Sequence, residues 1–187
     1  MASILDVPEI RASVHLWTVT DYRALAEDQP GFEHSELIRG IIMEKETKTI
    51  LHDKLVDIAA ERLRGAVRGV WWVRQEASMR LADSMPEPDV SVVAGTRDDY
   101  DDKPTTAALV VEVAVTSLAA DRAKAALYAE AGVGEYWIVL AEAGQVEAYR
   151  RPEGGVYLEK RTYRRGETVE GVEVLGGGAV AVDALFA

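Results

Sequence analysis

Hydrophobic and polar positions divide the first half of the chain into short, well-separated elements. A threonine cap and a following Pro-Gly pair predict a short helix within residues 18–31. Residues 36–44 have the pattern of two short strands around a tight turn. Apolar residues then recur with the helical period over residues 50–64, which predicts the first long helix. Residues 70–80 and 89–94 favour two strands with a proline-containing connection between them.

A strand–helix–strand unit follows an acidic loop at residues 95–106. Residues 109–115 are apolar on both faces except for Glu112, the pattern of a central strand covered on both sides. Residues 117–131 form an alanine-rich segment that predicts a helix followed by a glycine, and residues 135–140 predict the next strand. The crossover rule makes these two strands a parallel pair.

The last part of the chain predicts an antiparallel extension. Residues 146–151 and 156–163 flank a Pro-Glu-Gly-Gly turn and indicate a hairpin, and three glycines at 176–178 predict a loosened tail. The order helix, three strands, helix and strand, followed by the hairpin, predicts an α/β (α+β) fold with a mixed sheet. A length of 187 residues suits a single domain spanning residues 1–187.

Composition narrows the chemistry that this fold could carry. Hydrophobic residues make up 48% of the chain and charged residues 28%, which is typical of a packed globular protein. The absence of cysteine excludes disulfide scaffolds, thiol nucleophiles, iron–sulfur clusters and cysteine-type zinc sites. No stretch has the roughly 18 consecutive apolar residues of a membrane helix, and the first residues lack a signal-peptide pattern, so we expect a cytoplasmic protein without a membrane partner.

The charge distribution leaves room for a polyanion site. A net charge of −11, from 21 Lys+Arg against 32 Asp+Glu, would repel nucleic acid if it were evenly spread. It is uneven, because residues 39–80 contain nine basic and six acidic side chains and residues 160–165 hold a second basic cluster. This pattern argues against a DNA-packaging protein but permits a localised nucleic-acid site. Ordinary solvated charge on an acidic protein is the alternative interpretation.

Two carboxylates on neighbouring predicted strands form the candidate centre. Glu112 lies in an apolar strand, where a buried charge needs a cation or hydrogen-bond donors to compensate for lost hydration. Asp89 follows Pro88 and begins the preceding strand. Paired carboxylates suit a hard cation, Mg²⁺ or Mn²⁺, which binds phosphate oxygens and lowers the pKa of an attacking water. A salt bridge or a solvent-reaching position for Glu112, and a turn-initiating role for Asp89, are the structural alternatives.

A lysine near this pair would stabilise the charge that develops on a reacting phosphate. The compact Glu-x-Lys spacing occurs at Lys48, which has no suitable aspartate before it. Lys124 instead falls on the packed stripe of the helix that follows the Glu112 strand. A surface pair between Asp121 and Lys124 is an equally direct interpretation, and Arg122 is a second candidate cation.

Several motifs resemble those of one bacterial protein family. They are the run VVEVAVTSLAADRAK at residues 110–124, the runs at 127–133 and 135–139, Glu36-Leu37-Ile38-Arg39-Gly40, His52 and Pro88-Asp89-Val90. Over residues 17–151 the chain is similar to the Uma-type family of putative restriction endonucleases, within the PD-(D/E)XK nuclease superfamily. The resemblance implies a restriction-endonuclease-like core in the order αβββαβ. It also implies Asp89 and Glu112 as metal ligands, Glu36 as an auxiliary acid and Lys124 as a catalytic lysine moved from strand to helix.

The leading hypothesis is a Mg²⁺-dependent endodeoxyribonuclease that hydrolyses phosphodiester bonds in DNA. Its alternative is a catalytically inactive, nuclease-like module that binds nucleic acid or regulates. His52 is interpreted as a packing residue and Gln75 as an ordinary strand residue. Because relatives of this fold commonly form dimers, we also expect a homodimer, with residues 71–73 or 136–137 at its contact.

Overall fold

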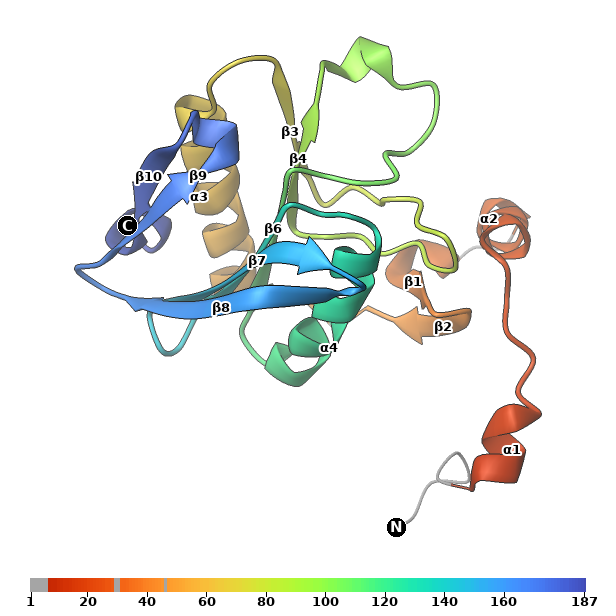
Figure 1. The fold of residues 1–187 in the computed structure, drawn as a ribbon. Helices are drawn as coiled ribbons and strands as arrows, with labels where there is room; N and C mark the ends of the chain where they lie inside the picture. Colours follow the sequence, from red (N-terminus) through yellow and green to blue (C-terminus); the bar gives the residue numbers. More distant parts are fainter. Residues whose placement is uncertain (1–6, 29–30, 46) are drawn as a thin grey trace. The chain divides into compact units, whose positions relative to one another are not determined.

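The computed structural model describes residues 7–28, 31–45 and 47–187 (Figure 1). The chain forms two compact units. The first comprises the described residues up to Lys45 together with Ala82–Met85, and the second comprises the rest. The interpretation of residues 1–187 as one domain stays a prediction. Within the described ranges, every helix is too short or too polar to span a bilayer.

The first unit contains a short hairpin and small helices. Its elements are α1 Pro8–Ala12, α2 Val19–Asp28, the 3₁₀ turn η2 Phe32–His34, β1 Ser35–Ile38 and β2 Ile41–Glu44. Thr18 caps α2, because its Oγ1 accepts a hydrogen bond from the Asp21 amide at 3.1 Å. The strands pair antiparallel around Arg39 and Gly40, whose φ angles of 52° and 73° suit a two-residue hairpin turn. Both the helix and the hairpin agree with the sequence-based expectation.

The second unit is a six-stranded mixed sheet with two long helices. In chain order it contains α3 Ile50–Ala66, β3 Trp71–Gln75, β4 Val90–Ala94, the 3₁₀ turn η3 Arg97–Asp99, β5 Leu109–Ala114, α4 Leu118–Glu130, β6 Glu135–Leu140, β7 Gln145–Glu153 and β8 Val156–Arg164. The strand order is β3-β4-β5-β6-β7-β8, and β5 and β6 are the parallel neighbours in this sheet. The predicted αβββαβ core with an added antiparallel hairpin, β7–β8, is confirmed.

The two long helices cover opposite faces of the sheet (Figure 1). Helix α3 packs against β3, β4 and β5, and its Leu55 and Leu63 share an apolar core with Val111 and Val113. Helix α4 packs against β5, β6, β7 and β8. Because side chains alternate along a strand, the odd-numbered residues of β5 face α3 and the even-numbered ones, including Glu112, face α4. A charged residue is therefore placed on the α4 side.

The carboxy-terminal segment corrects one expectation. A second hairpin forms from β9 Thr168–Val172 and β10 Gly178–Ala181, with the 3₁₀ turns η4 Glu173–Leu175 and η5 Val182–Leu185. Val169, Val172 and Val180 are buried in the same core as α3. The predicted loosening at residues 176–178 is therefore wrong. Those glycines turn the chain, and the apolar residues around them pack on the core.

Three smaller expectations also change. The strand predicted to reach residue 80 ends at Gln75, because Glu76 has a φ of 48° and leaves the extended region. Helix α3 continues one residue past Gly65. Tyr136 and Trp137 are each 0% exposed. The two aromatic residues therefore belong to the core of one chain and cannot form the predicted contact between two chains.

Candidate active site

Asp89 and Glu112 lie opposite each other at the junction of β4 and β5. The strands pair Val90 with Val111, and one residue further along the Asp89 amide donates a hydrogen bond to Glu112 Oε2 at 3.2 Å. The two residues are only 7% and 3% exposed. The structure thus brings the two carboxylates together in a mostly dry position, where each needs compensating donors.

Asp89 receives those donors from β5 and from α3. Its Oδ2 accepts a hydrogen bond from the Val113 amide at 2.7 Å and lies 3.2 Å from His52 Nε2. His52 lies in the first turn of α3, where Thr49 caps the helix by accepting the His52 amide at 3.1 Å. The hydrogen bond to Asp89 outweighs burial and raises the pKa of His52. The cap of α3 thus holds an imidazole beside the carboxylate.

Glu112 receives its donors from α4. The Tyr128 hydroxyl donates to Glu112 Oε1 at 2.9 Å, and Lys124 Nζ lies 3.5 Å from the same oxygen. The two side chains are four residues apart and therefore project from one stripe of the helix. The Lys124 side chain is 15% exposed. The lysine that periodicity placed on the packed stripe is directed at the Glu112 carboxylate.

Arg122, the other candidate cation of this helix, takes part in a separate ion cluster. Its guanidinium pairs with the buried carboxylate of Glu147 on β7. Lys160 Nζ and the Tyr149 hydroxyl bind the same carboxylate at 2.9 and 2.8 Å. Burial raises the pKa of Glu147, but the hydrogen bonds from Arg122, Lys160 and Tyr149 outweigh it and lower the pKa to about 2. This cluster ties α4 to the β7–β8 hairpin.

The remaining sequence candidates have different surroundings. Glu36 lies on β1 in the first unit, where it is buried, and its auxiliary role stays a prediction. Gln75 exchanges hydrogen bonds with Asp57 and Arg64 of α3, as an ordinary strand residue would. Lys48 pairs with a glutamate of the second unit. Neither of these last two contacts is with the carboxylate pair.

Sequence reasoning missed the contacts of two residues at this site. His52 was interpreted as packing, although it binds Asp89, and Tyr128 was placed on the α4 stripe without a role. The spacing of four residues between Lys124 and Tyr128 was the available signal for the tyrosine. For His52 the sequence offered only its place at the start of a helix, because its partner lies 37 residues away.

The arrangement combines hard oxygen ligands with a nearby ammonium group. Two adjoining carboxylates can bind a divalent cation, and Lys124 can face a phosphate oxygen at the same place. Among the described residues, no three or more side chains of ligating type gather closely enough to hold a metal by themselves. Mg²⁺ commonly uses one or two carboxylates and completes its shell with water and phosphate.

Comparison with known proteins supplies the family. The family model described as Uma2, "Putative restriction endonuclease", matches residues 19–183. The chain belongs to this family. Fold comparison agrees: the crystal structure of a putative nuclease of the DUF820 family from Anabaena variabilis superposes with a TM-score of 0.76. That match covers 90% of this chain and 97% of the other at 16% identity, which shows a common fold. No curated protein matches the chain.

Membership of the Uma2 family establishes the general class. The restriction-endonuclease resemblance and the predicted fold are both confirmed, and the family description is that of a nuclease. The carboxylate pair of the Uma2 chain lies within the matched residues, as do His52, Lys124 and Tyr128.

Proposed function

We propose that this protein is a divalent-metal-dependent endonuclease that hydrolyses phosphodiester bonds in DNA in the cytoplasm. The observation that supports this most directly is the adjoining, nearly buried pair Asp89 and Glu112 with Lys124 Nζ at 3.5 Å. Buried carboxylates destabilise a fold unless they are compensated, and this site combines them with a cation. Perturbed groups of this kind gather at functional sites.

The residues present fit a Mg²⁺ or Mn²⁺ ion. Asp89 and Glu112 would be its protein ligands, because their oxygens are hard donors on adjoining strands. A carboxylate oxygen that accepts one hydrogen bond keeps a second lone pair, so the contacts from Val113, His52 and Tyr128 do not prevent binding. When bound, the ion would bring positive charge to phosphate oxygens and lower the pKa of a water molecule.

The protein's own residues would then divide the remaining tasks. Lys124 would place its ammonium against the phosphate oxygens, where a preorganised charge stabilises the transition state. Tyr128 and His52 act as positioning residues, since they hold the orientations of Glu112 and Asp89 through their side chains. Glu36 is proposed to add a further negative charge to the metal site.

Cleavage of supercoiled plasmid DNA in Mg²⁺ tests the proposed activity. Asp89→Asn and Glu112→Gln should each abolish cleavage while keeping the native circular dichroism spectrum. Calorimetry with Mn²⁺ should detect binding to the wild-type protein and loss of binding in both variants. Wild-type rates in the two variants would show that the site is misplaced.

A nuclease-like module without turnover is the second candidate. The favouring observation is that both carboxylates are already satisfied by donors of the protein, among them Tyr128, His52 and the Val113 amide. Such a site is stable without an ion. The Mn²⁺ titration separates the two candidates, because only the enzyme requires a cation at the carboxylate pair.

We also propose that the protein works as a homodimer. With Tyr136 and Trp137 buried, the remaining predicted contact is the edge strand β3, whose Trp71 and Trp72 are partly exposed. Sedimentation at tens of micromolar should give a species of twice 20.4 kDa. A single species at the mass of one chain would contradict the dimer.

A further inference from the structure

Two buried polar side chains face each other across β3 and β4 without hydrogen-bond partners for several of their atoms. Arg74 and Ser91 are directly paired in the strand register and are 7% and 0% exposed. Arg74 Nη2 donates to the Ser78 carbonyl at 3.0 Å. Among the described residues, Arg74 Nε, Arg74 Nη1 and Ser91 Oγ have no hydrogen-bond partner. Three donor atoms are thus directed into one small region of the sheet.

No carboxylate of the described residues forms an ion pair with Arg74. Burial lowers the pKa of its guanidinium, against a smaller opposing effect of Tyr100. The guanidinium carbon lies 5.1 Å from the centre of the Trp72 ring, a contact that fixes the plane of the group but provides no acceptor. Leaving charged donors buried and unsatisfied is costly. The arrangement therefore calls for an acceptor from outside the chain.

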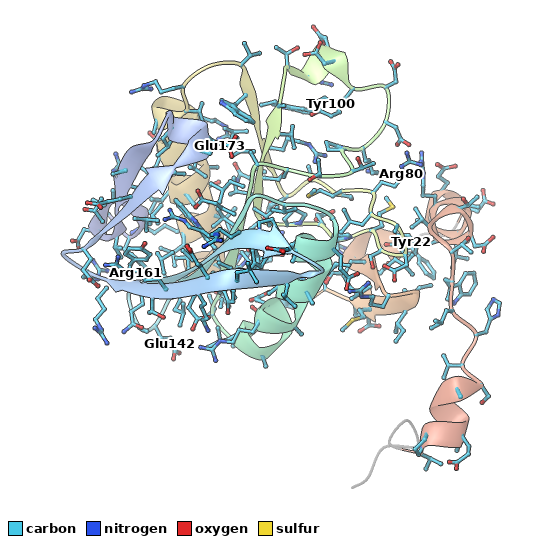
Figure 2. The ribbon with its side chains drawn as sticks, in the orientation of Figure 1. Tyr22, Arg80, Tyr100, Glu142, Arg161 and Glu173 are labelled. Atoms are coloured by element: carbon cyan, nitrogen blue, oxygen red, sulfur yellow. The ribbon has the colours of Figure 1, made fainter. Side chains whose placement is uncertain are left out.

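Arg74 lies in the lining of a surface pocket of about 500 Å³. Trp72 and Tyr100, whose ring centres are 5.7 Å apart, form its aromatic part. Arg97 and Lys103 add positive charge, and three exposed aspartates at 98, 101 and 102 stand on the same segment. Figure 2 shows the Tyr100 side chain extending from this segment beside β3 and β4, where its hydroxyl donates to the Ala94 carbonyl at 2.7 Å.

The position of the pair relates it to the carboxylates. Ser91 lies opposite Val110, and Glu112 is the next residue of β5 on the same face. Two residues along a strand correspond to roughly 7 Å. Arg74 and Ser91 therefore occupy the neighbouring row of the sheet face that carries Glu112.

We propose that Arg74 and Ser91 bind a phosphate of the nucleic-acid strand, next to the phosphate that is cleaved at Asp89 and Glu112. This inference rests on the proposed function. The unsatisfied atoms of Arg74 are donors only, so the ligand must supply acceptors, and a buried guanidinium selects an anionic one. The fork of Nε and Nη1 matches two phosphate oxygens, with Ser91 Oγ available for a third contact. Trp72 and Tyr100 offer apolar rings to the attached nucleoside.

The ligand must displace part of the cover over these atoms. The cover includes the segment of residues 95–106, which carries Tyr100 and has mostly exposed side chains. We expect this segment to move aside when a strand binds, because its side chains contribute little to the core. The three aspartates on it would then be carried away from the phosphate.

The test uses Arg74→Met, which keeps the apolar stem and removes the charge. Binding of a fluorescein-labelled single-stranded oligonucleotide of twelve thymidines is followed by anisotropy in the Asp89→Asn background, so that cleavage is not required. The dissociation constant should rise at least about tenfold, and the slope of log K against log salt should fall by about 0.7. The unfolding midpoint should rise, because an uncompensated buried charge is lost. Arg62→Met, an exposed change on α3, is the matched control and should alter affinity less than about threefold.

Ser91→Ala gives a second, independent measurement. It should weaken oligonucleotide binding several-fold while leaving the unfolding midpoint unchanged or higher, since an unpaired hydroxyl is removed. Inorganic phosphate should compete with the oligonucleotide in wild-type protein and lose this effect in Arg74→Met.

Three results would overturn the assignment. One is an unchanged salt slope in Arg74→Met together with a lower unfolding midpoint, which a purely structural arginine would give. Another is unchanged affinity in both variants, which an internal water at the site would give. The third is protection by inorganic phosphate without oligonucleotide binding, which would identify a small oxyanion. Failure of Mg²⁺-dependent cleavage by the wild-type protein would refute the proposed enzyme and leave the anisotropy result standing.

Discussion

Replacing Lys124 with alanine is the most direct test of the charge arrangement at this site. The ammonium lies 3.5 Å from Glu112 Oε1, and its side chain is 15% exposed. At an effective dielectric constant of about 20, two unit charges at this separation attract by about 5 kcal/mol before desolvation is subtracted. A phosphate held at the carboxylate pair would feel an attraction of the same order.

Only the part of this attraction that grows in the transition state affects turnover. Loss of one preorganised charge typically costs about 3 kcal/mol of transition-state stabilisation, which is about two orders of magnitude in rate. Lys124→Ala should therefore cut the single-turnover rate of plasmid cleavage about a hundredfold. Mn²⁺ affinity, measured by calorimetry, should stay equal or improve, because the ammonium no longer competes with the ion for Glu112. Lys124→Arg should restore only part of the rate, since the guanidinium is wider.

Arg122→Ala is the matched control. It removes a cation from the same helix that pairs with a different buried carboxylate, Glu147. It should lower the unfolding midpoint while leaving cleavage within about threefold of wild type. Cleavage by Lys124→Ala at the wild-type rate, or an equal loss in Arg122→Ala, would refute the assignment of the catalytic cation to Lys124.

Three further outcomes are expected. The pKa of Glu147, lowered from 4.5 to about 2, makes its ionised form stabilising. Urea unfolding should therefore find Glu147→Gln less stable than wild type at pH 7, with the difference shrinking as pH falls below 4.5 and disappearing near 2. Tyr128→Phe removes the hydroxyl donor 2.9 Å from Glu112 and should destabilise the protein by about 1 to 2 kcal/mol in the same assay; an unchanged midpoint would contradict the contact. Glu36→Gln should weaken Mn²⁺ binding or the cleavage rate several-fold without abolishing either, and full wild-type behaviour would reject its auxiliary role.

The core of the fold was predictable because its signals are local. The apolar run of β5, the alanine-rich α4 and the glycine after it lie next to one another in the chain. Gly132 has a φ of 71°, the left-handed conformation that a helix-ending glycine commonly adopts. A parallel pair then follows from chain connectivity alone.

Elements that depend on distant packing were not predictable. The β9–β10 hairpin is short and rich in glycine, and its valines become strand residues by packing with α3, which lies a hundred residues earlier. Strand propensity is weak in such a segment, and tertiary contacts decide. Likewise, the sequence gives no sign that Glu76 would adopt a positive φ and end β3.

The candidate site divides in the same way. Glu112 was visible as a charged residue inside an apolar strand, and Lys124 followed from helical periodicity. His52 meets Asp89 only because α3 packs beside β4 and β5. Its role depends on a contact between segments 37 residues apart, which neither periodicity nor spacing encodes.

The two faces of the central strands explain why the polar residues stand out once the fold is known. Toward α3, β4 and β5 present Val90, Val92, Val111 and Val113, all within the apolar core. Toward α4, the same part of the sheet carries Arg74, Ser91 and Glu112, each buried. Folding alone would favour apolar residues on both faces, because a buried polar group adds stability only when its partners fully offset desolvation. Glu112 has such partners and Arg74 lacks them for two nitrogens. The first is therefore explained by the protein alone, whereas the second requires a ligand.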